Sequence, residues 1–94
     1  MDALIATWHL HPEAAEEVMR DVAPMTAEVR RQPGFVAGYG VRATPATWMA
    51  VPVWEDEARM HAAAAVIAEL VRPLIEAGRL TLADVKTGPT EQWS

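Results

Sequence analysis

Three of the four tryptophans and the single tyrosine are the residues of this 94-residue sequence best suited to hold a ligand. Three segments alternate as β-strands do, and the apolar parity of each carries aromatic residues. These are Trp8 in 3–10, Tyr39 in 35–42, and Trp48 and Trp54 in 48–54. On one face of a sheet, their rings could stack on a planar molecule while their N–H and O–H groups bond to its oxygens. The alternative is that the four rings only fill the core.

The three histidines are the candidates for acid–base chemistry, because a neutral imidazole can remove a proton next to a carbonyl group near pH 7. His61 is the preferred general base, since it lies near the start of a predicted helix, seven residues after Trp54. The alternative for His61 is a solvated helix residue. His9 points away from Trp8, and His11 could cap a helix. His9 and His11 share a strand face but have no third ligand, so no metal site is expected.

The hydrophobic pattern predicts one domain over residues 1–94 with the element order β-α-β-β-α-β. Apolar stripes that repeat every three or four residues indicate two helices, the first from Pro12 to Pro33-Gly34 and the second from its cap Asp56 to Gly78. The expected strands are 3–10, 35–42, 48–54 and 79–87. This order is typical of a ferredoxin-like α+β fold, in which both helices cover one face of an antiparallel sheet.

Three prolines are expected to disturb these elements. Pro24 should kink or interrupt the first helix, and Pro73 should divide the second. Pro52 cannot donate a ladder hydrogen bond, so it favours an edge position or a bulge for the strand 48–54.

The composition limits the class of partner. Eight Lys plus Arg against 13 Asp plus Glu give a net charge of −5, and the basic residues are scattered, so neither nucleic acid nor an anionic membrane is expected. The absence of cysteine excludes disulfides, thiolate metal ligands and a Cys nucleophile. The N-terminus lacks the features of a secretory signal, and the longest apolar run, 62–68, is too short to span a bilayer. A cytoplasmic protein is the default expectation.

Two motifs mark the ends of the predicted helices. Gln32-Pro33-Gly34-Phe35-Val36 follows the first helix, and Val53-Trp54-Glu55-Asp56-Glu57-Ala58 leads into the second. In these motifs and their spacing, the sequence resembles the antibiotic-biosynthesis-monooxygenase-like branch of the dimeric α+β barrel superfamily. The resemblance implies a homodimer in which two four-stranded sheets meet face to face. It also implies a cavity between each sheet and its helices, where members bind hydrophobic aromatic molecules or haem.

The resemblance also suggests site residues. In members that oxidise anthrone-type substrates without metal or flavin, the catalytic set resembles an Asn, a Trp, a Tyr and an Arg. The Trp matches at Trp54, whereas the Asn position falls on Ala50, the Tyr position falls on Met60, and Arg72 is one residue out of register. The Trp of haem-degrading relatives falls in 62–65, which is all alanine, so haem degradation is not expected. The residues expected to bind substrate are Trp8, Trp48 and Met60.

The leading hypothesis is a monooxygenase, independent of metal and cofactor, that acts on an aromatic or polyketide-type secondary metabolite. An enolate or phenolate, formed by a base such as His61 or with the assistance of Tyr39, would react directly with dioxygen. Arg72 or Trp54 would stabilise the developing oxyanion. A cyclase or isomerase would use the same base and donor without oxygen. A ligand-binding or structural dimer without chemistry is the third hypothesis, under which replacing His61, Tyr39 or Arg72 changes no product.

Overall fold

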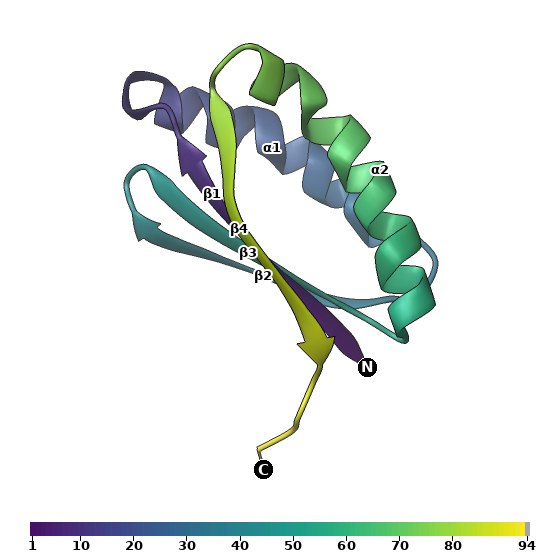
Figure 1. Cartoon of the computed structure of the whole chain (residues 1–94). Helices are drawn as coiled ribbons and strands as arrows, with labels where there is room; N and C mark the ends of the chain where they lie inside the picture. Colours follow the sequence, from purple (N-terminus) through teal and green to yellow (C-terminus); the bar gives the residue numbers. More distant parts are fainter. Residues whose placement is uncertain (94) are drawn as a thin grey trace.

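The four strands form one sheet in the order β2-β3-β1-β4, and all neighbouring strands are antiparallel. The computed structural model describes residues 1–93. Its elements are β1 (Asp2–Leu10), a short 3-10 helix (Pro12–Ala14), α1 (Ala15–Arg30), β2 (Phe35–Thr44), β3 (Thr47–Trp54), α2 (Glu57–Glu76) and β4 (Leu80–Pro89). Both helices lie on one face of the sheet, and the opposite face points away from them (Figure 1). The predicted ferredoxin-like α+β fold is confirmed.

The helix ends follow the predicted capping chemistry. His11 Nδ1 accepts a hydrogen bond of 3.3 Å from the main chain of the 3-10 turn. Asp56 Oδ1 accepts one of 2.8 Å from Arg59 N, which satisfies a main-chain donor that the first turn of α2 leaves free. After α2, Gly78 takes a φ of +72°, a conformation that glycine adopts without steric cost. The predicted cap Asp56 and the predicted end of the second helix are therefore confirmed, whereas His11 caps only the 3-10 turn, and α1 begins at Ala15 without a side-chain cap.

The predicted interruption of the helices by proline is wrong. Pro24 lies inside the continuous helix α1, and Pro73 lies inside the continuous helix α2. A proline removes one main-chain hydrogen bond, but tertiary packing can hold the helix on both sides of the gap. Buried Val71 and Leu74 flank Pro73 in this way, and buried Val22 precedes Pro24.

Of the two positions expected for Pro52, an edge or a bulge, the edge is wrong, because β3 lies between β2 and β1. The β1–β3 ladder accommodates Pro52 by an interruption: the paired residues pass from Ala3 and Val53 directly to Ala6 and Ala50. On its other side, Pro52 pairs with Gly38 of β2, next to a register shift. The missing N–H of Pro52 is thus placed where the ladder is already irregular.

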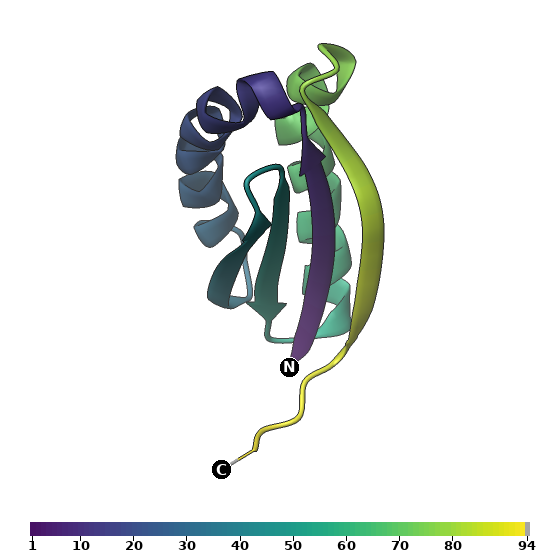
Figure 2. The same ribbon diagram turned by 90° about the vertical axis from the view of Figure 1, so that its left-hand side faces the viewer.

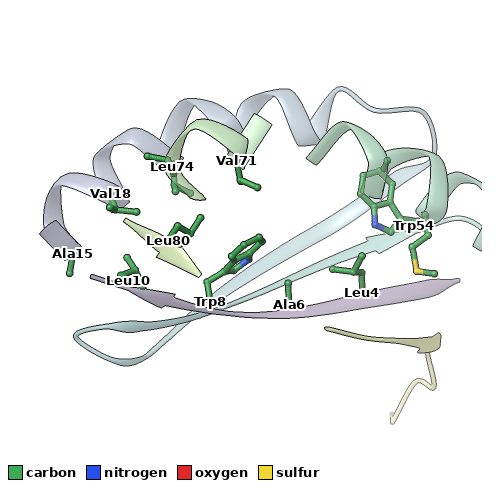
Figure 3. Packing of buried hydrophobic residues seen from close by; sticks show 13 residues of the cluster. Leu4, Ala6, Trp8, Leu10, Ala15, Val18, Trp54, Val71, Leu74 and Leu80 are labelled. Atoms are coloured by element: carbon green, nitrogen blue, oxygen red, sulfur yellow. The ribbon is translucent and has the colours of Figure 1, made fainter. Parts of the chain in front are cut away.

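The core lies between the helices and one face of the sheet (Figure 3). Alternate residues of β1 face the helices and are buried, namely Leu4, Ala6, Trp8 and Leu10. The most deeply buried side chains are Trp54, Met60, Leu80 and Val18. Figure 2 shows the order of the strands across the sheet, with α1 beside the β2–β3 hairpin and β4 at the opposite edge. Within residues 1–93, no helix is long and apolar enough to cross a membrane.

Candidate functional site

A cavity of about 360 Å³ lies between the sheet and the two helices. Its floor is formed by β1, β2 and β3, one wall by α1 and the other wall by α2. The lining is mostly apolar. It comprises Trp8, Val22, Met25, Thr26, Val29, Arg30, Phe35, Gly38, Tyr39, Gly40, Trp48, Ala50, Val51, Pro52, Ile67, Leu70, Val71 and Leu80.

A bulge in β2 decides which of its residues face this cavity. Phe35 pairs with Trp54, but the next pair is Ala37 with Val53, so Val36 is an extra residue in the strand. From this point on, the parity of β2 is shifted by one residue.

The shift places Gly38 opposite Pro52 and Gly40 opposite Ala50, on the helix-facing side. It places Tyr39 opposite Val51, so the side chain of Tyr39 points to the helix-free face, where it is 65% exposed. The alternation expected from the sequence, which put Tyr39 beside Trp8 and Trp48, is therefore wrong from the bulge onward. Tyr39 still borders the cavity, and we infer that it does so through its main chain.

The two glycines leave room for aromatic rings to approach the backbone of the strand closely. A methyl group added at Gly40 would lie 2.8 Å from Trp48 Nε1, and one added at Gly38 would lie 3.3 Å from the ring of Phe35. Trp48 is also the direct cross-strand partner of Trp8. The floor of the cavity is thus an aromatic surface. Any side chain larger than that of glycine at position 38 or 40 of β2 would crowd its rings.

Most polar groups of the cavity wall are hydrogen-bond donors. Arg30, at the end of α1, borders the cavity and is exposed, so its guanidinium group lies within reach of the cavity mouth, and Trp8 and Trp48 carry indole N–H groups. The hydroxyl of Thr26 donates to the Ala23 carbonyl at 2.7 Å. No carboxylate or imidazole belongs to the wall formed by the described residues. Nor do these residues contain a cluster of three or more His, Asp or Glu that could hold a metal ion.

The two ionisable residues that the sequence suggested on α2 lie outside the cavity lining. The side chain of His61 is 62% exposed, and its Nε2 lies 3.3 Å from Glu57 Oε1. Arg72 is also exposed, and its guanidinium pairs with Glu69. Each forms an ion pair or hydrogen bond within one helical turn on the outer surface of α2.

Trp54 and Met60 are fully buried and belong to the core, not to the cavity lining. The ring of Trp54 meets that of Phe35 edge to face, with centroids 5.5 Å apart and an interplanar angle of 75°. Its Nε1 is buried without a hydrogen-bond partner. Of the predicted site residues, the structure brings Trp8, Trp48 and the main chain of Tyr39 together. It places Trp54, Met60, His61 and Arg72 elsewhere.

Sequence reasoning missed Arg30 and the two glycines of β2. The glycines carried a usable signal, because Gly-x-Gly in an otherwise apolar strand indicates a place where another group approaches the backbone closely. Arg30 carried none, because a basic residue at the end of a helix is explained by the helix dipole alone.

Comparison with known proteins gives a family match and a set of similar folds. Residues 1–66 match the family model for antibiotic biosynthesis monooxygenases. No curated protein matches the sequence.

Among solved structures, SnoaB, a cofactor-independent oxygenase from Streptomyces nogalater, superposes with a TM-score of 0.70 at 22% identity, over 98% of this chain and 94% of SnoaB. HapK from Hahella chejuensis gives a TM-score of 0.78 at 16% identity, over 100% and 96% of the two chains. NE2512 from Nitrosomonas europaea, a protein of unknown function, gives 0.81 at 16% identity, over 99% and 94%. At these identities, the structural similarity establishes the fold.

Proposed function

Because the chain belongs to the antibiotic biosynthesis monooxygenase family, we propose that it is a cofactor-independent monooxygenase that acts on an aromatic, polyketide-type metabolite. The observation that carries the proposal is the cavity of about 360 Å³ with an aromatic floor between the sheet and the helices. This volume is within the range of small-molecule sites, roughly 300 to 1,000 Å³. Its apolar lining suits a flat hydrophobic molecule better than a sugar or a nucleotide.

The rings of Trp48 and Phe35 lie against the glycine positions of β2, so a planar substrate can stack on them. The indole N–H groups of Trp8 and Trp48 would serve as donors to carbonyl or phenol oxygens of such a substrate. The wall from α2 is aliphatic, and the wall from α1 is apolar apart from Thr26 and Arg30, so both would keep water from most of its surface.

Among the described residues, the cavity wall has no carboxylate or imidazole that could act as a general base. The substrate itself must therefore be acidic, as an anthrone is, and lose a proton to water or to its own phenolate. The resulting carbanion reduces dioxygen directly. One oxygen atom becomes the new carbonyl oxygen, the other leaves as water, and the substrate CH₂ group supplies the electrons. The donors of the wall would stabilise the anion that forms.

The test is oxygen uptake by the purified protein with anthrone, corrected for the uncatalysed oxidation. We expect one dioxygen consumed per anthrone converted to anthraquinone. Trp48→Ala should lower kcat/KM about tenfold or more, because a stacked ring is lost from the floor. Trp93→Ala is the matched control, since Trp93 lies in the C-terminal tail and is 93% exposed. An equal loss in both variants, or none in either, would contradict the assignment of the cavity.

A cyclase or isomerase would use the same cavity without oxygen, and a binding protein would use it without chemistry. These alternatives predict that anthrone-type molecules bind, that binding depends on Trp48, and that no oxygen is consumed. Product analysis under nitrogen separates them, because only a cyclase or isomerase converts its substrate there.

The helix-free face of the sheet supports a further part of the proposal, a homodimer. Its centre is apolar, with Met49, Val51 and Val53 from β3 and the exposed side chains of Tyr39 and Val41 from β2. A contiguous apolar surface of this kind is typical of an interaction site. We propose that a second copy of the chain covers it.

A further inference from the structure

Arg30 differs from nearly all other cations of this protein. Of the eight Lys and Arg residues, six have a carboxylate partner. These are Arg31, Arg42, Arg59, Arg72, Arg79 and Lys86. Within residues 1–93, only Arg20 and Arg30 form no ion pair, although the net charge is −5 and carboxylates are abundant. Only Arg30 of these two lines the cavity.

The local sequence explains why Arg30 stays unpaired. The nearest acidic residue, Glu28, accepts a hydrogen bond from the neighbouring Arg31 at 3.3 Å and is also bonded to Gln32. Arg30 follows Thr26 by four residues and thus lies one turn further along the cavity side of α1. The neighbouring lining residues Met25 and Val29 are apolar, so they offer its guanidinium no acceptor.

The wall therefore combines one uncompensated positive charge with an aromatic floor and no negative group among the described residues. A ligand complementary to it carries a flat apolar body and an anionic acceptor at one end. A guanidinium matches a carboxylate in particular, because its planar fork can donate two parallel hydrogen bonds.

We propose that the cavity selects aromatic ligands that carry a carboxylate, and that Arg30 is the residue that binds this group. The inference rests on the proposed function insofar as the cavity must hold an aromatic ligand, but it does not depend on oxygen chemistry. Arg30 is then a specificity-determining residue, and the natural substrate is an aromatic acid.

The test compares 2-anthracenecarboxylate with its neutral isostere 2-anthracenecarboxamide by calorimetric titration at pH 7. We expect the wild type to bind the acid about tenfold or more tightly than the amide, as charge-assisted hydrogen bonds allow. Arg30→Met should abolish this preference by weakening acid binding alone. Arg30→Lys should keep part of it, since the charge remains while the fork is lost. Arg20→Met is the matched control, because it removes an equally unpaired cation of α1 outside the cavity.

The outcomes separate this inference from the proposed function. Equal affinity of the wild type for acid and amide, or an unchanged preference in Arg30→Met, overturns the role of Arg30 while leaving the aromatic cavity in place. A preference lost equally in Arg20→Met overturns it too, because the effect is then one of net charge. If neither probe binds to the wild type, both the carboxylate site and the proposed aromatic-binding cavity are wrong.

Discussion

A methyl group at Gly40 would lie 2.8 Å from Trp48 Nε1, closer than carbon and nitrogen normally approach. We expect Gly40→Ala to displace the indole, at a cost of about 1 to 3 kcal/mol for overpacking. The gain from a stiffer unfolded chain, about 0.4 to 1 kcal/mol, offsets only part of this cost. The Kd for 2-anthracenecarboxamide should rise about tenfold, which corresponds to about 1.4 kcal/mol.

Gly88→Ala is the control for Gly40→Ala, because an added methyl group there meets no other atom within 4 Å. Urea unfolding and probe titration of both variants check the prediction. Unchanged affinity in Gly40→Ala would show that the ring of Trp48 does not form the binding floor.

At His61, we expect substitution to leave the chemistry intact. The imidazole is 62% exposed, pairs with Glu57 and does not line the cavity. His61→Gln should therefore keep kcat for anthrone oxidation within about twofold, whereas the loss of a true general base lowers it about a hundredfold to ten-thousandfold. Steady-state oxygen uptake distinguishes these results. A loss in the second range would restore His61 as the base and require substrate to reach the outer side of α2.

These residues also show which part of the site the sequence could predict. Trp8 and Trp48 follow from strand alternation, since the β1–β3 ladder keeps one register from Ala6 to His9 and pairs the two rings directly. Tyr39 could not be placed, because a single extra residue at Val36 reverses the parity of everything after it. A bulge depends on how a strand pairs with its neighbour, and the sequence of β2 alone does not determine that pairing.

At the scale of elements, the α1–β2 and β3–α2 connections form one joint. Glu55 N donates to the Gly34 carbonyl at 2.8 Å, and the rings of Phe35 and Trp54 meet edge to face. Arg59 from the first turn of α2 packs over Gly34 and pairs with Glu55. The two sequence motifs at the helix ends therefore lie side by side. Their residues hold the two layers together, which is a structural role.

Because of this joint, we expect alanine to cost more stability at Gly34 than at Gly78, the other glycine with a positive φ. Gly34 has a φ of +84° and Gly78 one of +72°, so alanine is strained at both, by about 1 kcal/mol. At Gly34, a methyl group would also lie 2.4 Å from Arg59 Cδ and 2.9 Å from its Cβ, whereas at Gly78 it meets nothing within 4 Å. Gly34→Ala should thus lose about 1 to 3 kcal/mol more than Gly78→Ala in urea unfolding.

The double variant Gly34→Ala with Arg59→Ala tests the cause of this difference. If contact with the arginine side chain is responsible, removing its outer atoms should recover part of the excess loss. No recovery would assign the cost to the backbone of the joint.

The order of elements was predictable because each helix carries its own periodicity, caps and stop signals in a short stretch of sequence. The continuity of the helices through Pro24 and Pro73 was not, because the packing that holds them comes from residues distant in the chain. The central position of β3 in the sheet could not be predicted for the same reason. Pro52 indicated an edge or a bulge, and the interruption of the β1–β3 ladder together with the register shift against β2 makes an internal position acceptable.

At the scale of the whole molecule, the two faces of the sheet differ in what covers them. The helices cover one face, and the other presents apolar side chains beside Asp84 and Lys86 of β4. A chain of 94 residues buries a modest share of its surface alone, so pairing would hide apolar area that one core cannot. Charges of both signs at the margin suit a self-complementary contact, in which each copy offers the same surface to the other.

The proposed dimer can be tested by introducing a charged residue on the helix-free face and, as a control, another on the outer surface of α2. Val41 lies on the helix-free face and is 51% exposed, while Ile75 of α2 is 43% exposed and lies away from that face. Wild type should sediment at twice the monomer mass. Val41→Glu should raise the dimer Kd more than about a hundredfold, since an unpaired buried charge costs about 3 kcal/mol or more. Ile75→Glu should stay dimeric, because its charge would remain in water. A monomeric wild type, or equal dissociation by both variants, would mean that the helix-free face is not where two copies meet.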